Sequence, residues 1–330
     1  MLARVTSIDV ARAAGVSQTT VSFVLNGKNE HGISSVTRQL VLETAQRLGY
    51  APSAVARALR TGRSHVVAFL LTDAPMSVPF ARFRREVTAA LQARGFTCVF
   101  IELTGLTGGA SAVWQHLQPA VVISTAPLPE QDHRALTSLG VKIMDGALSS
   151  ADASIAGLDQ RAVGRLQVRH LAERGHRKIG FAAVEEPQDQ PFCLPRLEGA
   201  REQCRELGLA EPAVEVMDYS LPRASAAVAR WHAGDSPVSA VAAYNDTAAV
   251  AILGACRLGD LAVPGELAVV GVDDEPIAAL TVPPLTTIAI DLTVSARALA
   301  ASIVALALDG SPEPTTGTPE SLTVIHRESS

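Results

Sequence analysis

The sequence of 330 residues has few cysteines, no long apolar segment and no recognisable export signal. Its four cysteines are scattered without a C-x-x-C pair, which excludes a disulfide scaffold and gives no support to a zinc site. We expect them to be small buried side chains in a reducing cytosol: Cys98, Cys193, Cys204 and Cys256. No run of about 18 uncharged apolar residues occurs, so we expect neither a membrane span nor secretion.

Motifs for catalysis and cofactor binding are also missing. There is no G-x-S-x-G elbow and no Walker loop, and the glycines at residues 105–109 do not form a dinucleotide fingerprint. The eight histidines do not have the spacing of metal ligands. We therefore predict no catalytic residue, no metal and no cofactor, and we do not expect an enzyme.

Charge is divided unequally along the chain. Residues 1–63 contain eight Lys or Arg and three Asp or Glu, a net charge of +5. Because the whole chain has a net charge of −5, the remainder carries −10. A small basic module joined to an acidic body is typical of a head that binds a polyanion, although a solvated basic face would look the same.

The first 50 residues have the pattern of three short helices. Apolar residues cluster at helical spacing over 8–14, Gly15 interrupts them, and Ser17 is placed to cap a second helix. Ser34 or Ser35 then caps a third helix, for which Gly49 supplies a left-handed stop. The pattern predicts a helix, a tight glycine turn and a second helix, followed by a third.

From residue 64 onward, apolar runs of strand length alternate with amphipathic helical stretches. The predicted strands are 66–71, 97–103, 120–124, 141–144, 178–184, 214–219, 240–244 and 267–272. The predicted helices are 80–94, 162–173, 197–207, 223–231 and 247–258. Continuous rather than alternating apolar strands indicate parallel sheets covered on both faces, and two such α/β units are implied. Ligands of such sheets bind beyond the carboxyl ends of the strands.

The helix–turn–helix pattern indicates DNA binding, because such a motif places its second helix in the major groove of DNA. Gln18 and Thr19, at the start of that helix, would meet base edges. Short polar residues nearby suit contacts with phosphates: Ser17, Thr20, Ser22 and Asn26. The alternative is a three-helix scaffold for a partner other than nucleic acid.

These residues resemble a known family. Residues 5–27 and 47–64 look like the opening of the lac and gal repressor family, and the resemblance extends over essentially the whole chain. It implies further DNA contacts from Thr6, Ser34, Thr37 and Tyr50. Phe23 stands where the family usually has Arg, so either an apolar contact with a thymine methyl or simple packing is expected there.

The resemblance also implies a hinge at residues 53–60 that becomes helical only on operator DNA. This segment is short for an autonomous helix. In a dimer, Leu59 would be inserted between central base steps through the minor groove, with Ala56 packed nearby and Arg57 on phosphate. An ordinary flexible linker is the alternative.

The family's sensor resembles periplasmic sugar-binding proteins, and several segments here match it: 166–181, 196–199, 244–246 and 270–274. The resemblance and the strand-end rule together place Arg196, Asn245 and Asp273 in a ligand pocket. The aromatic candidates for its walls are Tyr219, Phe80 and Phe192. A salt bridge between the lobes is the alternative role for Arg196 and Asp273, and core packing is the alternative for the aromatic residues.

The predicted architecture is an all-α helix-turn-helix head joined to a two-lobed α/β sensor of the type I periplasmic-binding-protein kind, with parallel sheets. We assign residues 1–51 to the DNA-binding domain, 52–63 to the hinge, and 64–330 to effector binding and dimerisation. The first lobe is expected at about 64–160 and 289–322, and the second at about 161–288.

The predicted function is a cytoplasmic, nucleoid-associated regulator of transcription that binds a specific DNA sequence. We expect a homodimeric repressor on a pseudo-palindromic operator, controlled allosterically by a sugar or nucleoside between the lobes. Two other functions are weighed: a solute-binding protein, which the basic head and missing export signal oppose, and an α/β enzyme with an accessory helical domain.

Overall fold

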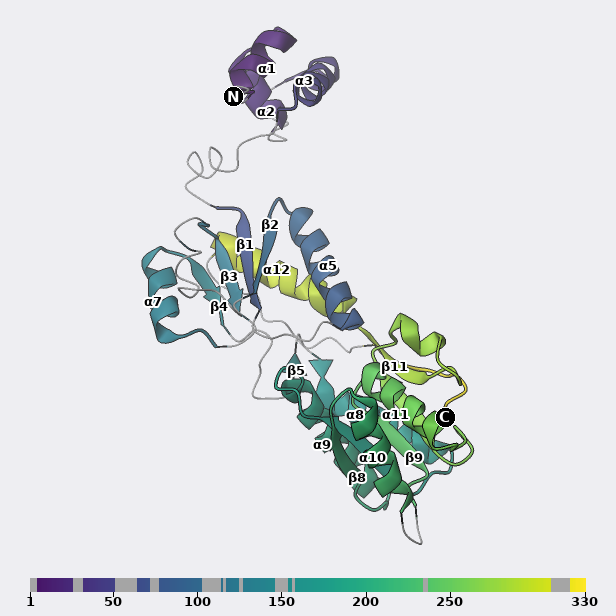
Figure 1. Cartoon of the computed structure of the whole chain (residues 1–330). Helices are drawn as coiled ribbons and strands as arrows, with labels where there is room; N and C mark the ends of the chain where they lie inside the picture. Colours follow the sequence, from purple (N-terminus) through teal and green to yellow (C-terminus); the bar gives the residue numbers. More distant parts are fainter. Residues whose placement is uncertain are drawn as a thin grey trace. The chain divides into compact units, whose positions relative to one another are not determined.

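The computed structural model separates into two compact units, residues 1–65 and 66–330, whose elements are drawn in Figure 1. The residues it describes are 5–25, 32–50, 64–71, 77–102, 114, 117–124, 127–145, 154–155, 158–233, 237–309 and 321–330. In these ranges, no helix combines the length and the apolar character required to cross a bilayer.

The described part of the first unit is built of three helices, α1 (Ser7–Ala14), α2 (Gln18–Leu25) and α3 (Ser35–Arg47). Gly15 ends α1 with a φ of 66°, a left-handed conformation that glycine adopts without strain. Val10, Val21 and Val41, one from each helix, are fully buried in a common core. The predicted helix, glycine turn and helix are confirmed.

The second unit begins with a parallel sheet in the order β2-β1-β3-β4. Its strands are β1 (Val66–Leu71), β2 (Thr97–Glu102), β3 (Val121–Ser124) and β4 (Lys142–Met144). Alternate residues of β1 enter different cores: Val67 packs with helix α5 (Val78–Gln92), whereas Leu70 packs with Leu136 of α7 (Glu130–Ser138). This sheet with its helices is called the first lobe, and both faces are covered, as the continuous apolar strands predicted.

The second lobe is built on a six-stranded sheet in the order β12-β11-β10-β9-β7-β8. Its strands are β7 (Ile179–Val184), β8 (Ala213–Met217), β9 (Ala240–Ala243), β10 (Ala268–Val272), β11 (Thr286–Asp291) and β12 (Ser321–Ile325). Among the described strands of this sheet, β12 runs antiparallel beside β11 and the others are parallel. Its helices are α8 (Gln160–Glu173), α9 (Gln190–Glu206), α10 (Leu221–His232), α11 (Asp246–Leu258) and the 3-10 turn η1 (Pro276–Ala279). A two-stranded ribbon, β5 (Ser154–Ile155) and β6 (Leu158–Asp159), precedes them.

At helix α12 (Thr293–Asp309) the chain crosses from the second lobe back to the first. It follows β11 of the second sheet, yet its buried residues Ala300 and Ile303 belong to the core of the first lobe. Figure 1 shows α12 beside α5, and the two helices are in contact. Strand β12 then returns to the second sheet. The sheets confirm the predicted fold class.

Helices α8 and α9 approach each other closely because two glycines face the opposite backbone. A Cβ atom at Gly164 would overlap the carbonyl group of Arg196, and one at Gly199 would overlap that of Arg161. Glycine permits this contact, which any larger residue would block. The Arg-x-x-Gly element thus fixes the position of Arg196.

Candidate DNA interface and ligand site

The start of α2 presents the two residues predicted to read bases. Gln18 and Thr19 are both exposed in the first turn of this helix. Gln18 Nε2 donates to Ser7 Oγ over 3.1 Å, which ties the amide to α1. A helix start with exposed side chains is also where backbone N–H groups favour anions such as phosphate.

Three of the predicted DNA contacts cap helices. Ser17 Oγ accepts from Thr20 N at 3.0 Å, and the two hydroxyls lie 2.8 Å apart. Thr6 and Asp9 form a capping box at α1, in which Thr6 Oγ1 donates to Asp9 Oδ2 over 2.7 Å. Ser34 likewise caps α3 by accepting from the backbone of Thr37 at 3.1 Å. These hydroxyls therefore stabilise the helix ends that face a DNA backbone in the predicted complex.

The remaining head residues differ in their surroundings. Ser22 and Phe23 are half-buried on α2, and Phe23 lies one turn after Thr19 on the same face. Tyr50 packs against the core of the head. Asn26, Ala56, Arg57 and Leu59 lie outside the described residues.

The predicted ligand residues of the second lobe meet at the carboxyl ends of its strands. Tyr219 follows β8, Asn245 follows β9 and Asp273 follows β10, while Arg196 lies on α9. Because these parallel strands end at one edge of the sheet, the residues are brought together. With Asp189 and Tyr244 they form what we call the strand-end cluster.

Asp189 is the residue that links the aromatic members of this cluster. It lies just before α9 and is only 3% exposed. Its carboxylate accepts a hydrogen bond from Tyr219 Oη at 2.5 Å and another from Tyr244 Oη at 3.1 Å. Asn245 Nδ2 donates in turn to Tyr219 Oη over 3.1 Å. A buried carboxylate is thus satisfied by phenols rather than by a cation.

Arg196 is held from three sides. Its Nε donates to Gln160 Oε1 at 2.9 Å and its Nη1 donates to the carbonyl of Tyr244 at 2.8 Å. Its Nη2 lies 3.8 Å from Asp273 Oδ1, too long for a good hydrogen bond. The ion pair therefore lies within the second lobe, not between lobes, and its separation suits a ligand group that bonds to both partners.

Burial sets the protonation of the cluster. It raises the pKa of Asp273, an effect that Arg196 opposes and Asp189 reinforces. Burial is also the main cause of the raised pKa values of Tyr219 and Tyr244, so both phenols remain neutral donors. The cluster combines carboxylates, neutral hydroxyls, an amide and one guanidinium, which together suit a ligand rich in hydroxyl groups.

The loop that carries Asp273 has an unusual backbone. Asp273 and Asp274 have φ angles of 108° and 48°, in the region that favours glycine. The next residue, Glu275, donates its N–H to Asp246 Oδ2 at 2.8 Å. Asp246 is fully buried, and burial raises its pKa to about 7. Such strain persists only where the surroundings hold it, and it is common at binding sites.

Not every predicted wall residue joins the cluster. Phe192 is partly buried and packs against the core of the second lobe. Phe80 lies in the first turn of α5 in the first lobe, and no hydrogen bond or ring contact connects it to the cluster within the described ranges. Asp189, Gln160 and Tyr244 were not predicted as site residues, although Asp189 and Tyr244 both follow strands of the sheet, where ligands of such folds bind.

Comparison with known proteins covers both units. A model of bacterial regulatory proteins of the lacI family matches residues 7–53, and one of the periplasmic binding protein-like domain matches residues 168–330. The HTH-type transcriptional regulator CelR of Thermobifida fusca is 32% identical over 298 residues, 84% of this chain and 85% of the relative. The ribose operon repressor of Escherichia coli (strain K12) is 30% identical over 289 residues, 85% of this chain and 86% of the relative.

Among solved structures, a transcriptional regulator CelR–cellobiose complex has a TM-score of 0.66 and is 27% identical. The match covers 99% of this chain and 100% of that chain. The similarity therefore includes head and sensor together.

Proposed function

Because the chain belongs to the lacI family of bacterial regulatory proteins, we propose that it represses transcription from an operator and that a sugar bound at the strand-end cluster changes its affinity for that DNA. Membership makes it a DNA-binding transcription regulator with a ligand-binding sensor, and its family consists of regulators rather than enzymes. This confirms the predicted DNA-binding regulator with an effector-binding sensor, and it excludes the two alternative functions, a solute-binding protein and an enzyme.

The observation that carries the sugar proposal is the chemistry of the strand-end cluster. Arg196 Nη2 lies 3.8 Å from Asp273 Oδ1, and both residues are at least nine-tenths buried. A vicinal diol of a sugar can therefore accept a hydrogen bond from Arg196 and donate one to Asp273. Tyr219, which joins the cluster through Asp189 and Asn245, offers an aromatic ring for such a ligand. The cellobiose complex of the similar regulator supports a saccharide over other hydroxyl-bearing ligands.

For the head, we propose that α2 enters the major groove. Gln18 and Thr19 would contact base edges, and Phe23, on the face of Thr19, would meet a thymine methyl. The proposed contacts with the DNA backbone are Thr6, Ser17, Thr20, Ser22, Asn26, Ser34, Thr37 and Tyr50. We propose a hinge at 52–63, with Ala56, Arg57 and Leu59 acting in the minor groove.

We also propose that the protein acts as a homodimer. Leu280 is 74% exposed and Val282 is 90% exposed, next to η1, which packs on α11. Exposed apolar residues close together in the fold are typical of a protein interface. Two copies related by a twofold axis would match a pseudo-palindromic operator. A bacterial regulator of this kind works in the cytoplasm, and we further propose that it associates with the nucleoid.

The test is to select operator sequences from random duplex DNA with the full-length protein and then titrate the complex with cellobiose, ribose and a nucleoside. We expect an enriched palindrome, and at least one saccharide should change its affinity by about 5- to 150-fold. If no duplex is enriched, the repressor proposal is wrong. If only the nucleoside changes the affinity for DNA, the repressor proposal stands and the sugar assignment is wrong.

A further inference from the structure

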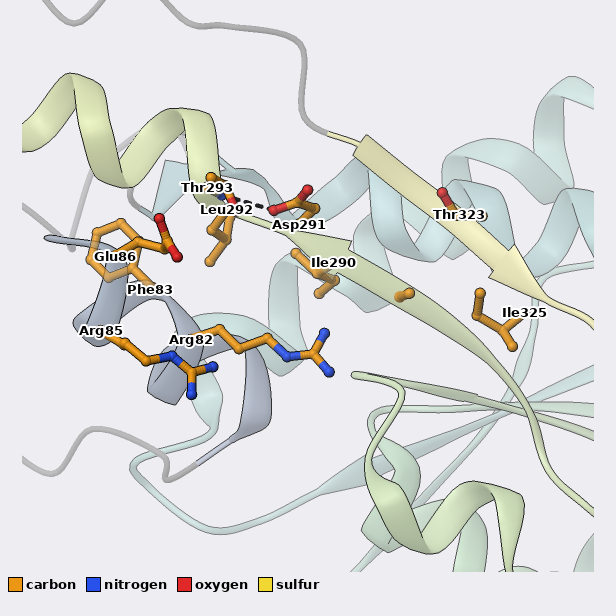
Figure 2. A pocket seen from close by; sticks show the side chains of 11 residues that line it. Arg82, Phe83, Arg85, Glu86, Ile290, Asp291, Leu292, Thr293, Thr323 and Ile325 are labelled. Atoms are coloured by element: carbon orange, nitrogen blue, oxygen red, sulfur yellow. Dashed lines mark hydrogen bonds between the residues drawn. The ribbon is translucent and has the colours of Figure 1, made fainter. Parts of the chain in front are cut away.

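A cavity whose lining includes none of the strand-end cluster lies among α5, the connection from β11 to α12, and β12 (Figure 2). Its volume is about 460 Å³, within the range of small-molecule sites. We call it the crossover pocket, and it is lined by Arg82, Phe83, Arg85, Glu86, residues 289–293, Thr323 and Ile325.

Two cations of the crossover pocket are available for a ligand. Arg82 and Arg85 lie three residues apart on α5, so they share a face of the helix, and Figure 2 shows Arg82 reaching from α5 toward Ile290. Within the described ranges, neither guanidinium forms a salt bridge within 4 Å. A guanidinium binds phosphate or carboxylate through paired N–H groups.

The nearby carboxylates already have partners. Glu86 lies 3.5 Å from a guanidinium nitrogen of Arg297. Asp291 Oδ1 accepts from Thr293 N at 2.9 Å. Hydrogen bonds from Thr293 are the main cause of the lowered pKa of Asp291, and Arg82 adds to the effect from a greater distance. In the part of the chain that the structure describes, no carboxylate lies within 4 Å of the Arg85 guanidinium, and Arg82, Arg85 and the adjacent Arg297 together outnumber Glu86 and Asp291 by one positive charge.

The other lining residues suit a ligand that carries an apolar or hydroxyl-bearing organic group in addition to its anion. Phe83 and Ile290 are each 4% exposed and supply apolar surface. Thr293 and Thr323 also line the pocket and add hydroxyl groups. Such a mixture selects a small metabolite over a bare inorganic ion.

The pocket is built from both lobes. Arg82 and Arg85 belong to a helix of the first lobe, whereas Ile290 and Thr323 belong to strands of the second sheet. A ligand that contacts both favours the arrangement of lobes in which it binds more tightly.

We propose that the crossover pocket is a second ligand site, which binds a small metabolite carrying a phosphate or carboxylate through Arg82 and Arg85. Its lining shares no residue with the strand-end cluster, where the sugar is proposed to bind. The ligand is recognised by its negative charge, which distinguishes it from the hydroxyl-rich ligand of the strand-end cluster.

Calorimetric titration of the full-length protein tests the site with phenyl phosphate, benzoate and uncharged phenol. At about 0.15 M ionic strength, we expect at least one of the two anions to bind about tenfold more tightly than phenol, and more weakly as salt rises. Stronger binding of phenyl phosphate would identify a phosphate ester, and stronger binding of benzoate a carboxylic acid. Equal binding of all three probes, or none, would overturn the proposal.

Substitutions test whether the anion binds in this pocket. The double variant Arg82→Gln/Arg85→Gln should weaken the anion by about tenfold or more, with an unchanged melting temperature because both side chains are exposed. Arg94→Gln removes the same kind of charge just beyond the end of α5 and outside the pocket, so it should leave binding unchanged. Asp273→Asn should also leave it unchanged. Equal losses in the double variant and in Arg94→Gln, or a loss only in Asp273→Asn, would overturn the proposal.

Discussion

The guanidinium of Arg327 lies 2.7 Å from a carboxylate oxygen of Asp274, and this ion pair holds the loop that carries Asp273. Arg327 also donates through Nη1 to the carbonyl of Leu285 at 2.8 Å. Since Asp273 and Asp274 both have positive φ angles, the loop depends on such contacts to keep its shape. Residues near the end of the chain thus position a carboxylate of the proposed sugar site.

Replacing Arg327 with Ala should therefore weaken sugar binding by about tenfold, and it should cost about 1–3 kcal/mol of unfolding free energy. Both partners are less than a third exposed, so the pair is not a surface contact. Calorimetry with the sugar and urea unfolding measure the two effects. Arg134→Ala, which breaks an exposed pair with Glu130, is the control and should change stability by less than about 1 kcal/mol. Unchanged sugar affinity in Arg327→Ala would show that the pair does not position Asp273.

Tyr219→Phe removes one hydroxyl and leaves the ring in place. Asp189 and Asn245 each lose a partner, so we expect sugar affinity to fall by about five- to twentyfold. Operator affinity without sugar should stay as in the wild type. Val216→Ala, an exposed change on β8, the strand that precedes Tyr219, is the control and should leave sugar affinity unaltered. A sugar affinity equal to that of wild type in Tyr219→Phe would exclude this hydroxyl network from recognition.

Gly199→Ala should be strongly destabilising, by about 1–3 kcal/mol or more, because its Cβ would meet the backbone of Arg161. Gly259→Ala is the matched control, since its Cβ would come no closer than 3.5 Å to other atoms. Urea unfolding compares the two. If both variants were equally stable, the close approach of α8 and α9 would not depend on glycine.

The buried His170 predicts a loss of stability in acid. Burial is the main cause that lowers its pKa from 6.5 to about 4, so the unfolded chain binds the proton more readily than the folded one. The free energy of unfolding should therefore fall as the pH drops from about 6.5 toward about 4. His170→Gln, which can still bond to Ser330 Oγ, should show a shallower fall in the same window. Parallel pH profiles for the two proteins would contradict this.

Several helices and strands were predictable because the apolar pattern of the segment directly reflects how it is buried. The run 66–71 became β1 with the predicted limits, since six consecutive apolar residues fit a strand covered on both faces. Helix α7 was not foreseen, because Leu136 is its only buried residue and its apolar pattern is weak. Strand β12 was also missed: it runs antiparallel at the edge of its sheet, where pairing depends on β11 rather than on its own sequence.

The site could be predicted only in part for a similar reason. The strand-end rule and the family resemblance located Arg196, Asn245 and Asp273 at one edge of the second sheet. Neither could show that Asp189 is satisfied by two phenols, because those hydrogen bonds join residues up to 55 positions apart in the sequence. Which side chains form hydrogen bonds across such distances depends on tertiary packing, and a local sequence pattern does not contain that information.

If a ligand at the strand-end cluster controls the affinity of α2 for DNA, saturating sugar must change the binding of the operator. The dissociation constant of the selected operator is determined by fluorescence anisotropy, with and without saturating sugar, for the wild type and for Asp273→Asn. We expect a change of about 5- to 150-fold in the wild type and almost none in the variant, with equal affinities when sugar is absent. An equal response to sugar in both proteins would contradict it.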